Sequence, residues 1–425
     1  MVKVVVCGGS IGGLSAALNL HKAGCEVLVY ERASAIQPAG AGLGLDPDTV
    51  ETMGELGLQE AFNLISRPIP FEEYRWLDSQ AEQPGRAGVP IIINRQHNHV
   101  SLHWSDLHRM LYDALPTGIV KQAHSITAFQ QHTNRVRVTV EQRADSSLPA
   151  TFEVEADLLV AADGANSTVR KLLRPDDRRR YSGMIAWRGV VDGSSHPELL
   201  QALIEDYEHL DRGIIFDISS DCCMNLIYLL PGNRINWLWY RDAPEPKLSS
   251  HSVTVSATAD DIRQLLSDAD ATWTPAFARL IKATERPFIN AIFDKDPLSS
   301  WTYGRVVLVG EAAHPTTPHG SRSTNMSLQD SFALGRCIAA SLDDIPQALQ
   351  AFEKLRVQQT SQEVLFSRYV GEIRQGRWID PRSFDWLSKP ASTRTMLLNA
   401  SRSIPDFHTV ALGEFQSAGI TVAGV

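Results

Sequence analysis

A glycine-rich turn and one carboxylate are the chemistry-bearing groups of the N-terminal stretch VKVVVCGGSIGGLSAALNLHKAGCEVLVYERA. Gly8 can make a tight turn after an apolar run, and Gly13 lets a following helix pack closely on a sheet. Ser10 stands where such patterns usually carry a middle glycine, and its hydroxyl could donate a hydrogen bond. Glu31 follows Gly13 by 18 residues, a position from which a carboxylate accepts hydrogen bonds from ribose hydroxyls. These residues predict a dinucleotide site.

The elements that must position these groups read as strand, turn, helix and strand. Residues 2–6 are a β-branched run, typical of a strand buried on both faces. Apolar residues at helical spacing over 14–20 predict a helix, which Gly24 ends. Residues 27–30 form a second strand with Glu31 at its tip. The helix of this βαβ unit offers its free N–H groups to a pyrophosphate.

Two further strand-end motifs carry acidic residues. In DLLVAADGANSTVRKLL, the apolar run predicts a strand, Asp163 and Gly164 turn the chain, and a helix begins near Ser167. In VVLVGEAAHPTTPHGSRSTN, Gly310 and Glu311 end another apolar run, and a loop of small polar residues follows. A carboxylate at such a strand end can accept hydrogen bonds from cofactor hydroxyls.

Together the three motifs resemble those of the FAD-dependent aromatic hydroxylases, the single-component flavoprotein monooxygenases, over about residues 1–345. The resemblance places Asp163 and Gly164 near the FAD pyrophosphate. It gives Glu311 the part of the usual aspartate that holds a ribitol hydroxyl. Pro318 and Asn325 match the residues that bracket the loop touching the flavin ring. Within the family, the GGS turn and YSGMIAWRGVV are similar to the 2,6-dihydroxypyridine 3-hydroxylases, whose substrate is not carried over.

The residues assigned to non-covalently bound FAD come from all three motifs. They are Gly8, Ser10, Ile11, Gly13, Glu31, Arg32, Asp163, Gly164, Gly310, Glu311, Pro318, Ser321, Ser323, Thr324 and Asn325. No metal is expected, because the five cysteines form no CxxC pair and no histidine spacing suits zinc.

The flavin-contacting loop departs from the family pattern. Glu311 is one methylene longer than the usual aspartate. Ser321 and Ser323 stand in a loop that usually has two glycines, and their backbone N–H groups can serve the flavin edge if no positive φ is required. Arg322, between them, either adds positive charge at the flavin or points to solvent.

A further departure lies in LHWSDLHRMLYDAL, before and within a predicted helix. Trp104 takes the place of an arginine that in the family often reaches the FAD phosphates. Arg109, one turn on, is expected at the surface. Phosphate contacts must therefore come more from backbone groups or from another residue.

Catalytic candidates are few. Arg188 is a charged residue in an apolar strand, so it is either paired or faces a cavity. His319 follows Pro318 and is a candidate base, whereas His314 in EAAHP is expected to be structural. The predicted hairpin over 224–240 has three aromatic residues that either line a substrate site or pack within the sheet, namely Tyr228, Trp237 and Trp239.

The resemblance implies an oxidoreductase whose cofactor carries the chemistry. NADPH or NADH, as a transient co-substrate, would reduce FAD, and O₂ would form a C4a-hydroperoxide that hydroxylates a small aromatic or heteroaromatic substrate. One dinucleotide unit is visible, so no separate nicotinamide domain is expected. A flavin-dependent reductase or dehydrogenase on the same fold, and a non-hydroxylating flavin-binding protein, remain as alternatives.

The expected fold class is α/β. A Rossmann-like FAD-binding domain, with a mixed sheet and flanking helices, is interleaved with an antiparallel-sheet substrate domain and followed by C-terminal helices. The FAD-binding domain is expected in residues 1–75, 98–183 and 290–345, and the substrate domain in 76–97 and 184–289. Residues 346–425 are expected to form a helical region.

Composition limits the partners. The 425 residues are 43% hydrophobic and 21% charged, and the formal net charge is −9, which gives no reason to expect nucleic acid. No apolar run approaches the roughly 18 residues that a membrane helix needs. The chain leads directly into a strand, so we expect no targeting segment, a cytoplasmic location and a possible homodimer.

Overall fold

The computed structural model describes residues 1–35, 40–77, 88–95, 97–143, 150–219, 223–248, 253–255 and 257–374. Within them the chain forms an α/β fold with parallel and antiparallel sheets, which confirms the predicted fold class. Trp378, Trp386 and the C-terminal tail, for which the sequence predicts packing on the body or a second subunit, lie outside the described residues. None of the described helices is long and apolar enough to cross a membrane.

The dinucleotide unit lies in the middle of a mixed sheet. Among the described residues this sheet has, in spatial order, β19 (Thr302–Tyr303), β20 (Val306–Leu308), β12 (Leu158–Ala161), β1 (Lys3–Cys7), β2 (Glu26–Tyr30) and β8 (Val120–Lys121). Its neighbours pair in parallel except β19 with β20. Parallel pairing brings the carboxyl ends of β1, β12 and β20 to one edge, where all three sequence motifs begin.

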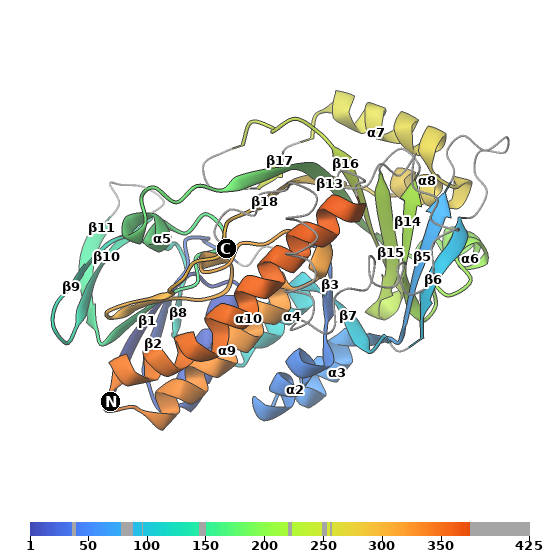
Figure 1. Cartoon of the computed structure of the whole chain (residues 1–425). Helices are drawn as coiled ribbons and strands as arrows, with labels where there is room; N and C mark the ends of the chain where they lie inside the picture. Colours follow the sequence, from blue (N-terminus) through green and yellow to red (C-terminus); the bar gives the residue numbers. More distant parts are fainter. Residues whose placement is uncertain are drawn as a thin grey trace, which may run out of the picture.

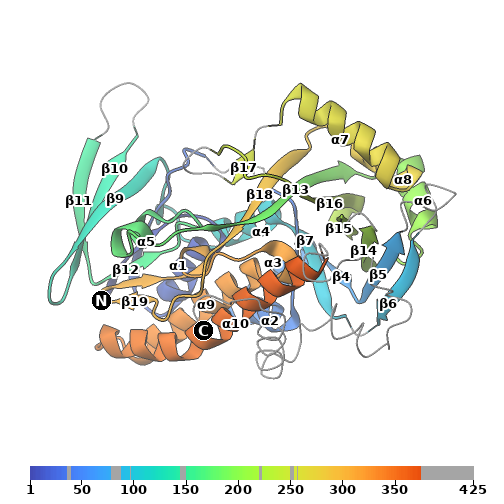
Figure 2. The ribbon, with the colours of Figure 1, turned by 45° about the horizontal axis from the view of Figure 1, so that its top comes forward.

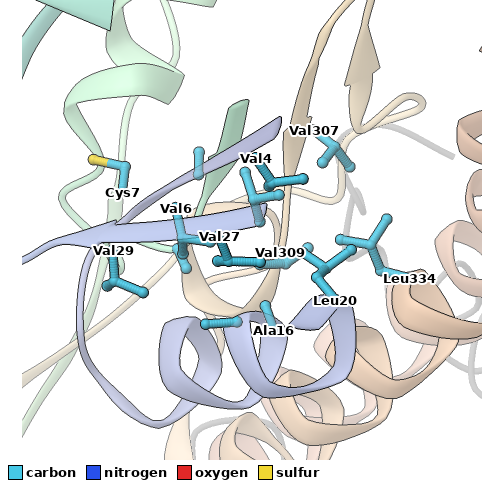
Figure 3. Close-up of a cluster of buried hydrophobic side chains, with 14 of the residues drawn as sticks. Val4, Val6, Cys7, Ala16, Leu20, Val27, Val29, Val307, Val309 and Leu334 are labelled. Atoms are coloured by element: carbon cyan, nitrogen blue, oxygen red, sulfur yellow. The ribbon is translucent and has the colours of Figure 1, made fainter. Parts of the chain in front are cut away.

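A hydrophobic core joins this sheet to its helices. Val4 and Val6 of β1 pack with Leu20 of α1 (Ile11–Lys22), with Val307 of β20, and with Leu334 of α9 (Ser323–Ala340) (Figure 3). Of residues 2–6, predicted to be buried on both faces, positions 4–6 are buried, whereas Val2 is half-buried and Lys3 is exposed. Helix α10 (Ile345–Arg374) runs beside α9 in both views (Figures 1 and 2).

The second large sheet is mostly antiparallel and lies at the other end of the molecule (Figure 1). In the described part of the chain its strands are, in spatial order, β17 (Thr254–Val255), β18 (Phe288–Asp294), β13 (Arg180–Asp192), β16 (Arg234–Asp242), β15 (Met224–Leu230), β14 (Gly213–Ser219), β5 (Phe71–Leu77) and β6 (Val89–Asn94). The predicted hairpin is confirmed as β15 and β16, joined by the 3-10 turn η1 (Pro231–Asn233). The sheet therefore combines an early segment of the chain with its middle.

Helices cover one face of this sheet, as both ribbon views show (Figures 1 and 2). They are α6 (Pro197–Asp206), α7 (Ala259–Thr272) and α8 (Pro275–Lys282). The sequence also predicts helices over 200–210 and 256–266, and the structure has both. Helix α6 begins three residues earlier than expected, and α7 begins three residues later. Capping explains the later start of α7, since Thr258 and Asp261 form a reciprocal capping box.

Smaller elements connect the two large sheets. One three-stranded sheet is β3 (Gly42–Leu45), β7 (His99–His103) and β4 (Ser66–Ile69), and another is β9 (His124–Gln131), β10 (Val136–Gln142) and β11 (Ala150–Ala156). The remaining helices and turns are α2 (Pro47–Glu55), α3 (Gln59–Ile65), α4 (Trp104–Asp113), α5 (Thr168–Leu173), η2 (Gly310–Ala312) and η3 (Pro318–Gly320).

Alternation along β15 and β16 separates the three hairpin aromatic residues. Trp237 and Trp239 face the covering helices, where both are buried in one hydrophobic cluster with Phe277. Tyr228 faces the opposite side, toward β3, because a Cβ on Gly42 would lie 2.5 Å from its hydroxyl oxygen. Sheet packing is therefore the correct interpretation for both tryptophans, and only Tyr228 lies on the side of the dinucleotide unit.

Replacing Trp237 tests this assignment of faces. Trp237→Phe is expected to lower the free energy of unfolding by about 2 kcal/mol, because it removes packed ring atoms and an indole N–H. That N–H donates to Thr284 Oγ1 at 2.9 Å. Thermal unfolding should show a lower midpoint while the folded protein keeps its affinity for FAD. An unchanged midpoint together with weaker FAD binding would contradict the assignment.

Candidate active site

In the turn after β1, backbone segments lie too close together for side chains to fit between them. Gly8 has φ +103°, and a Cβ there would lie 2.5 Å from the carbonyl oxygen of Ala162. A Cβ on Gly13 would lie 1.9 Å from the carbonyl oxygen of Gly8. Both positions therefore require glycine, as the sequence predicts. Ser10 is exposed, precedes α1 and makes no capping bond with its hydroxyl, which stays available to a ligand.

Glu31 and His108 hold this turn from two sides. The N–H of Gly9 donates to Glu31 Oε2 at 2.6 Å, and the N–H of Ala33 donates to Oε1 at 2.7 Å. The carbonyl of Gly9 accepts from His108 Nε2 at 2.8 Å. A carboxylate oxygen can accept more than one hydrogen bond, so Glu31 can still bind ribose hydroxyls. Sequence spacing did not reveal that Glu31 also fixes the phosphate turn, nor that His108 takes part.

A cavity of about 1350 Å³ opens beside the turn. Gly9, Ser10 and Glu31 line one side, and Arg188, Phe288 and Asn290 line the side formed by the large sheet. Trp104, His108 and Tyr112 also line it, spaced four residues apart on one face of α4. The cavity thus joins the dinucleotide turn to the strand that carries Arg188. Ile11 is buried at the start of α1, and Arg32 is exposed next to Glu31.

Trp104 occupies the place of the expected phosphate-binding arginine and forms an aromatic stack. Its ring lies 4.8 Å from that of His108, with an interplanar angle of 21°. Arg109 is exposed at 63% and pairs with Asp113 on the surface, which confirms the prediction for that residue. The cavity wall along α4 is therefore aromatic where the family pattern has a cation.

Asp163 precedes helix α5 and accepts hydrogen bonds from the first turn of that helix. Its carboxylate accepts from Ser167 Oγ at 2.5 Å and from the N–H of Thr168 at 2.6 Å. Burial raises the pKa of Asp163, and these hydrogen bonds partly oppose that rise. A Cβ on Gly8 would lie 3.0 Å from the Cα of Asp163, so this backbone borders the phosphate turn. Gly164 has φ +79°, which allows the chain to turn here.

Asp330 organises the end of β20. Its Oδ2 accepts from the N–H of Gly310 at 3.0 Å and lies 2.6 Å from His314 Nε2, while its Oδ1 accepts from Arg356 Nε at 2.8 Å. Burial raises the pKa of this carboxyl, but the His314 and Arg356 charges and hydrogen bonds outweigh burial and hold the pKa below its usual range. His314 therefore has the structural position expected of it. Sequence reasoning missed Asp330 and Arg356, because their spacing carries no motif.

The loop after Pro318 is fixed by side chains from distant segments. Asn325 Nδ2 donates to the carbonyls of Gly44 and Ser321 at 3.0 and 2.7 Å, and its Oδ1 accepts from the N–H of Asp46 at 3.0 Å. Thr324 lies half-buried in the first turn of α9. Asn325 thus ties this loop to β3, which lies beneath Tyr228 of the large sheet.

Ser321 does not meet the condition stated for it, and one of the two alternatives for Arg322 is excluded. Ser321 has φ +56°, so its place does require the left-handed conformation that glycine adopts more easily. Arg322 neither points to solvent nor carries an uncompensated charge, since it pairs with Asp46 at 3.0 Å and with Glu363 of α10 at 3.0 Å. The two carboxylates come from segments far away in the sequence, so neither pairing was readable from it.

The two catalytic candidates lie on the same face of the large sheet. Arg188 lines the cavity, and among the described residues its Nε has no hydrogen-bond partner. Burial raises the pKa of the nearby Tyr228 phenol, and the charge of Arg188 opposes that rise. His319 is buried, with its ring 4.7 Å from that of Tyr240. Arg188 thus faces a cavity, one of the two possibilities that its sequence left open.

The Asp330 cluster makes a pH-dependent prediction. A carboxylate with a lowered folded-state pKa adds stability that is present above its unfolded pKa, about 3.9, and is lost as pH falls through the folded value. Asp330→Asn should lower the free energy of unfolding at pH 7 by about 3–5 kcal/mol, because it leaves a buried cation without its partner. Urea unfolding of wild type and Asp330→Asn from pH 7 to pH 3 should show that the difference between their free energies of unfolding narrows below about pH 4.

The exposed Asp296, which pairs with Arg368, supplies the control. Asp296→Asn is expected to change the free energy of unfolding by less than about 1 kcal/mol. If the free energies of unfolding of wild type and Asp330→Asn differ by the same amount across the pH range, the charge of Asp330 does not stabilise the fold.

Known proteins are similar to this chain in sequence and in fold. The FAD binding domain family matches residues 1–365. A 3-amino-4-hydroxybenzoate 2-monooxygenase of Streptomyces platensis is 29% identical, with 84% of each chain covered. A 6-hydroxynicotinate 3-monooxygenase of Bordetella bronchiseptica is 27% identical, with 84% of this chain and 88% of that one covered.

Solved structures extend the likeness to nearly the whole chain. HpxO of Klebsiella pneumoniae, in complex with FAD and uric acid, has a TM-score of 0.76 at 23% identity and covers 97% of each chain. The 2,6-dihydroxypyridine-3-hydroxylase of Arthrobacter nicotinovorans has a TM-score of 0.74 at 23% identity, with 92% of this chain and 95% of that one covered. The family match over residues 1–365, together with this shared fold, shows that the chain belongs to the FAD binding domain family.

Proposed function

We propose that this chain is an NAD(P)H-dependent FAD monooxygenase that inserts one oxygen atom from O₂ into a small aromatic or heteroaromatic ring. The supporting observation is the cavity that joins the dinucleotide turn to Arg188. The relatives named for aminohydroxybenzoate, hydroxynicotinate and urate act on rings of this size. The lining combines aromatic and aliphatic side chains with Arg188, and it also includes the charged residues Arg286, Asp192 and Glu285. A small planar ring carrying an acidic hydroxyl suits the part of this cavity next to Arg188.

The residues present fit FAD. Gly8 and Gly13 leave no room for side chains at the turn, which is what a closely approaching pyrophosphate requires. We assign the ribose hydroxyls to Glu31, the ribitol to Glu311, and the flavin edge to the loop from Pro318 to Asn325. When bound, the flavin supplies the redox chemistry and the activation of O₂.

The protein's own residues would bind, orient and ionise the ring. Arg188 is half-buried, with Ala186 and Val190 as its neighbours on the same strand face, so its charge is less screened than it would be in water. A guanidinium there favours the phenolate over the phenol, which makes the ring more electron-rich. His319 is buried within the flavin-contacting loop, outside the set of cavity-lining residues, and is the candidate base for the hydroxyl proton.

Substrate-stimulated oxidation of NADH or NADPH tests the proposal. The FAD-loaded protein is mixed with each reductant in turn and with a panel of phenols and hydroxypyridines under ¹⁸O₂. We expect faster oxidation with one group of rings and one ¹⁸O atom in the product. Oxidation of the reductant without oxygen in any product would instead support a reductase. Retained FAD without oxidation of either reductant would support a non-hydroxylating flavin-binding protein.

Changing Arg188 tests its part. Arg188→Met should raise KM for an ionisable ring substrate by about 10- to 100-fold, because a charge-assisted contact is lost. Arg188→Lys should recover part of that loss. Arg109→Met, which removes an exposed arginine of similar size, is the matched control and should leave KM unchanged. Equal KM values for Arg188→Met and wild type would exclude substrate binding by Arg188.

Trp104 offers a second test, on the cofactor side. Trp104→Arg should tighten FAD binding by about tenfold, because it places a guanidinium in the cavity wall next to the phosphate turn. Trp104→Phe keeps an aromatic ring and should leave the dissociation constant within about twofold. Flavin fluorescence titration of apoprotein measures both, and rising salt should weaken the arginine variant more steeply than wild type. If Trp104→Arg binds FAD no more tightly than wild type, the FAD phosphates do not lie next to α4.

A further inference from the structure

Two of the departures from the family pattern are in direct contact. Ser323, at the place of a loop glycine, donates its hydroxyl to Glu311 Oε1 at 2.7 Å. Glu311 lies in η2 after β20, and Ser323 is the first residue of α9. The longer acid and the added hydroxyl thus meet across a separation of 12 residues.

The backbone on each side of this contact is fixed independently. Gly310, which precedes Glu311, donates its N–H to the buried Asp330 of α9 at 3.0 Å. The carbonyl of Ser323 accepts from Ser327 Oγ at 2.8 Å, and a Cβ on Gly310 would lie 2.9 Å from that same Oγ. The turn that carries Glu311 is therefore packed against the first turns of the helix that carries Ser323. The gap between the two side chains is set by the fold, and only a side chain of matching length bridges it.

Each change would be unfavourable without the other. A glutamate has one more rotatable bond than an aspartate, so its carboxylate is harder to hold in one place. With glycine at 323 that carboxylate would lose its hydrogen-bond donor. With aspartate at 311 the carboxylate would be one methylene short of the Ser323 hydroxyl. The carboxylate also lies next to the N-terminus of α9, whose free N–H groups favour negative charge.

The contact leaves half of the carboxylate for a ligand. Ser323 uses Oε1, and Oε2 of Glu311 has no hydrogen-bond partner among the described residues. Glu311 is only half-buried, so a ligand hydroxyl could reach it. At another serine–glutamate contact of this chain, one carboxylate oxygen accepts several hydrogen bonds from protein groups. Glu353 Oε2 accepts from Ser300 Oγ at 2.9 Å and also from the N–H groups of Trp301 and Thr302.

We propose that Ser323 is a positioning residue that fixes Glu311 for the ribitol chain of FAD, so that the two residues work as a coupled pair. Glutamate with serine and aspartate with glycine are two equivalent solutions, and the mixed combinations are both defective. This inference rests on the FAD site proposed above, in which Glu311 binds the ribitol.

A double-mutant cycle on FAD affinity tests the coupling. The dissociation constant is measured by flavin fluorescence on reconstituted apoprotein for wild type, Glu311→Asp, Ser323→Gly and the double variant. We expect each single change to weaken binding by about tenfold, the size of one lost hydrogen bond to a charged group. The double variant should return to within about threefold of wild type. Ser323→Ala should weaken FAD binding as much as Ser323→Gly does, because the hydroxyl of Ser323, and not its backbone, holds Glu311.

The Ser300 and Glu353 pair supplies the matched control. Glu353→Asp and Ser300→Gly make the same chemical changes at another serine–glutamate hydrogen bond. They are expected to lower the thermal midpoint of the apoprotein and to leave the FAD dissociation constant unchanged. Thermal midpoints of all variants separate loss of fold from loss of affinity.

Two results would overturn the inference, and they are distinguishable. The first result is that the FAD dissociation constant of the double variant rises by the product of the two single-variant factors, while Glu311→Ala also binds FAD weakly. In that case the coupling is wrong and the ribitol assignment stands. If Glu311→Ala binds FAD as tightly as wild type, the ribitol assignment fails and the coupling fails with it.

Discussion

A buried carboxylate on which three segments converge is the constraint on which the end of β20 and the loop after Pro318 depend. Asp330 has no solvent exposure, so its charge is tolerable only because Gly310, His314 and Arg356 compensate it. Those groups belong to the end of β20, to the loop that follows, and to α10. Any displacement of one segment would leave a charge without a partner in a low dielectric. The position of the loop is therefore an electrostatic consequence of where α9 places one side chain.

The nucleotide half of the site depends mainly on close contact between backbone segments. Gly8 allows the turn to approach the end of β12, and Gly13 allows α1 to approach the turn, at distances that any side chain would prevent. Glu31 and His108 then hold the peptide of Gly9 from both of its polar groups. This half is assembled from one continuous segment, the end of β12 and one contact from α4, whereas the flavin half needs residues from four segments. The two halves meet at the edge of the mixed sheet.

This difference explains what the sequence could predict. The strand, turn, helix and acid of residues 1–31 are local, and their periodicity and glycine chemistry carry the whole prediction. The hairpin of β15 and β16 is also local and was predicted correctly. The partners of Arg322 come from Asp46 and Glu363, which are separated from it by 276 and 41 residues, and no spacing rule connects them. The sheet face of Trp237 depends on which helices cover it, and alternation alone does not decide that.

Charge placement around the cavity connects these points to the chemistry. The cation that the sequence placed nearest the flavin edge, Arg322, is neutralised by two carboxylates, and the arginine expected at the phosphates is Trp104. FAD would then be held mainly by backbone N–H groups, hydroxyls and the ends of helices α1 and α9, which contribute partial charges rather than full ones. Arg188 remains a full charge on the cavity wall, on an apolar strand, with a donor still unsatisfied within the described residues. A full charge attracts an ionised ring more strongly than partial charges do, so we propose Arg188 as the contact for an ionised substrate ring.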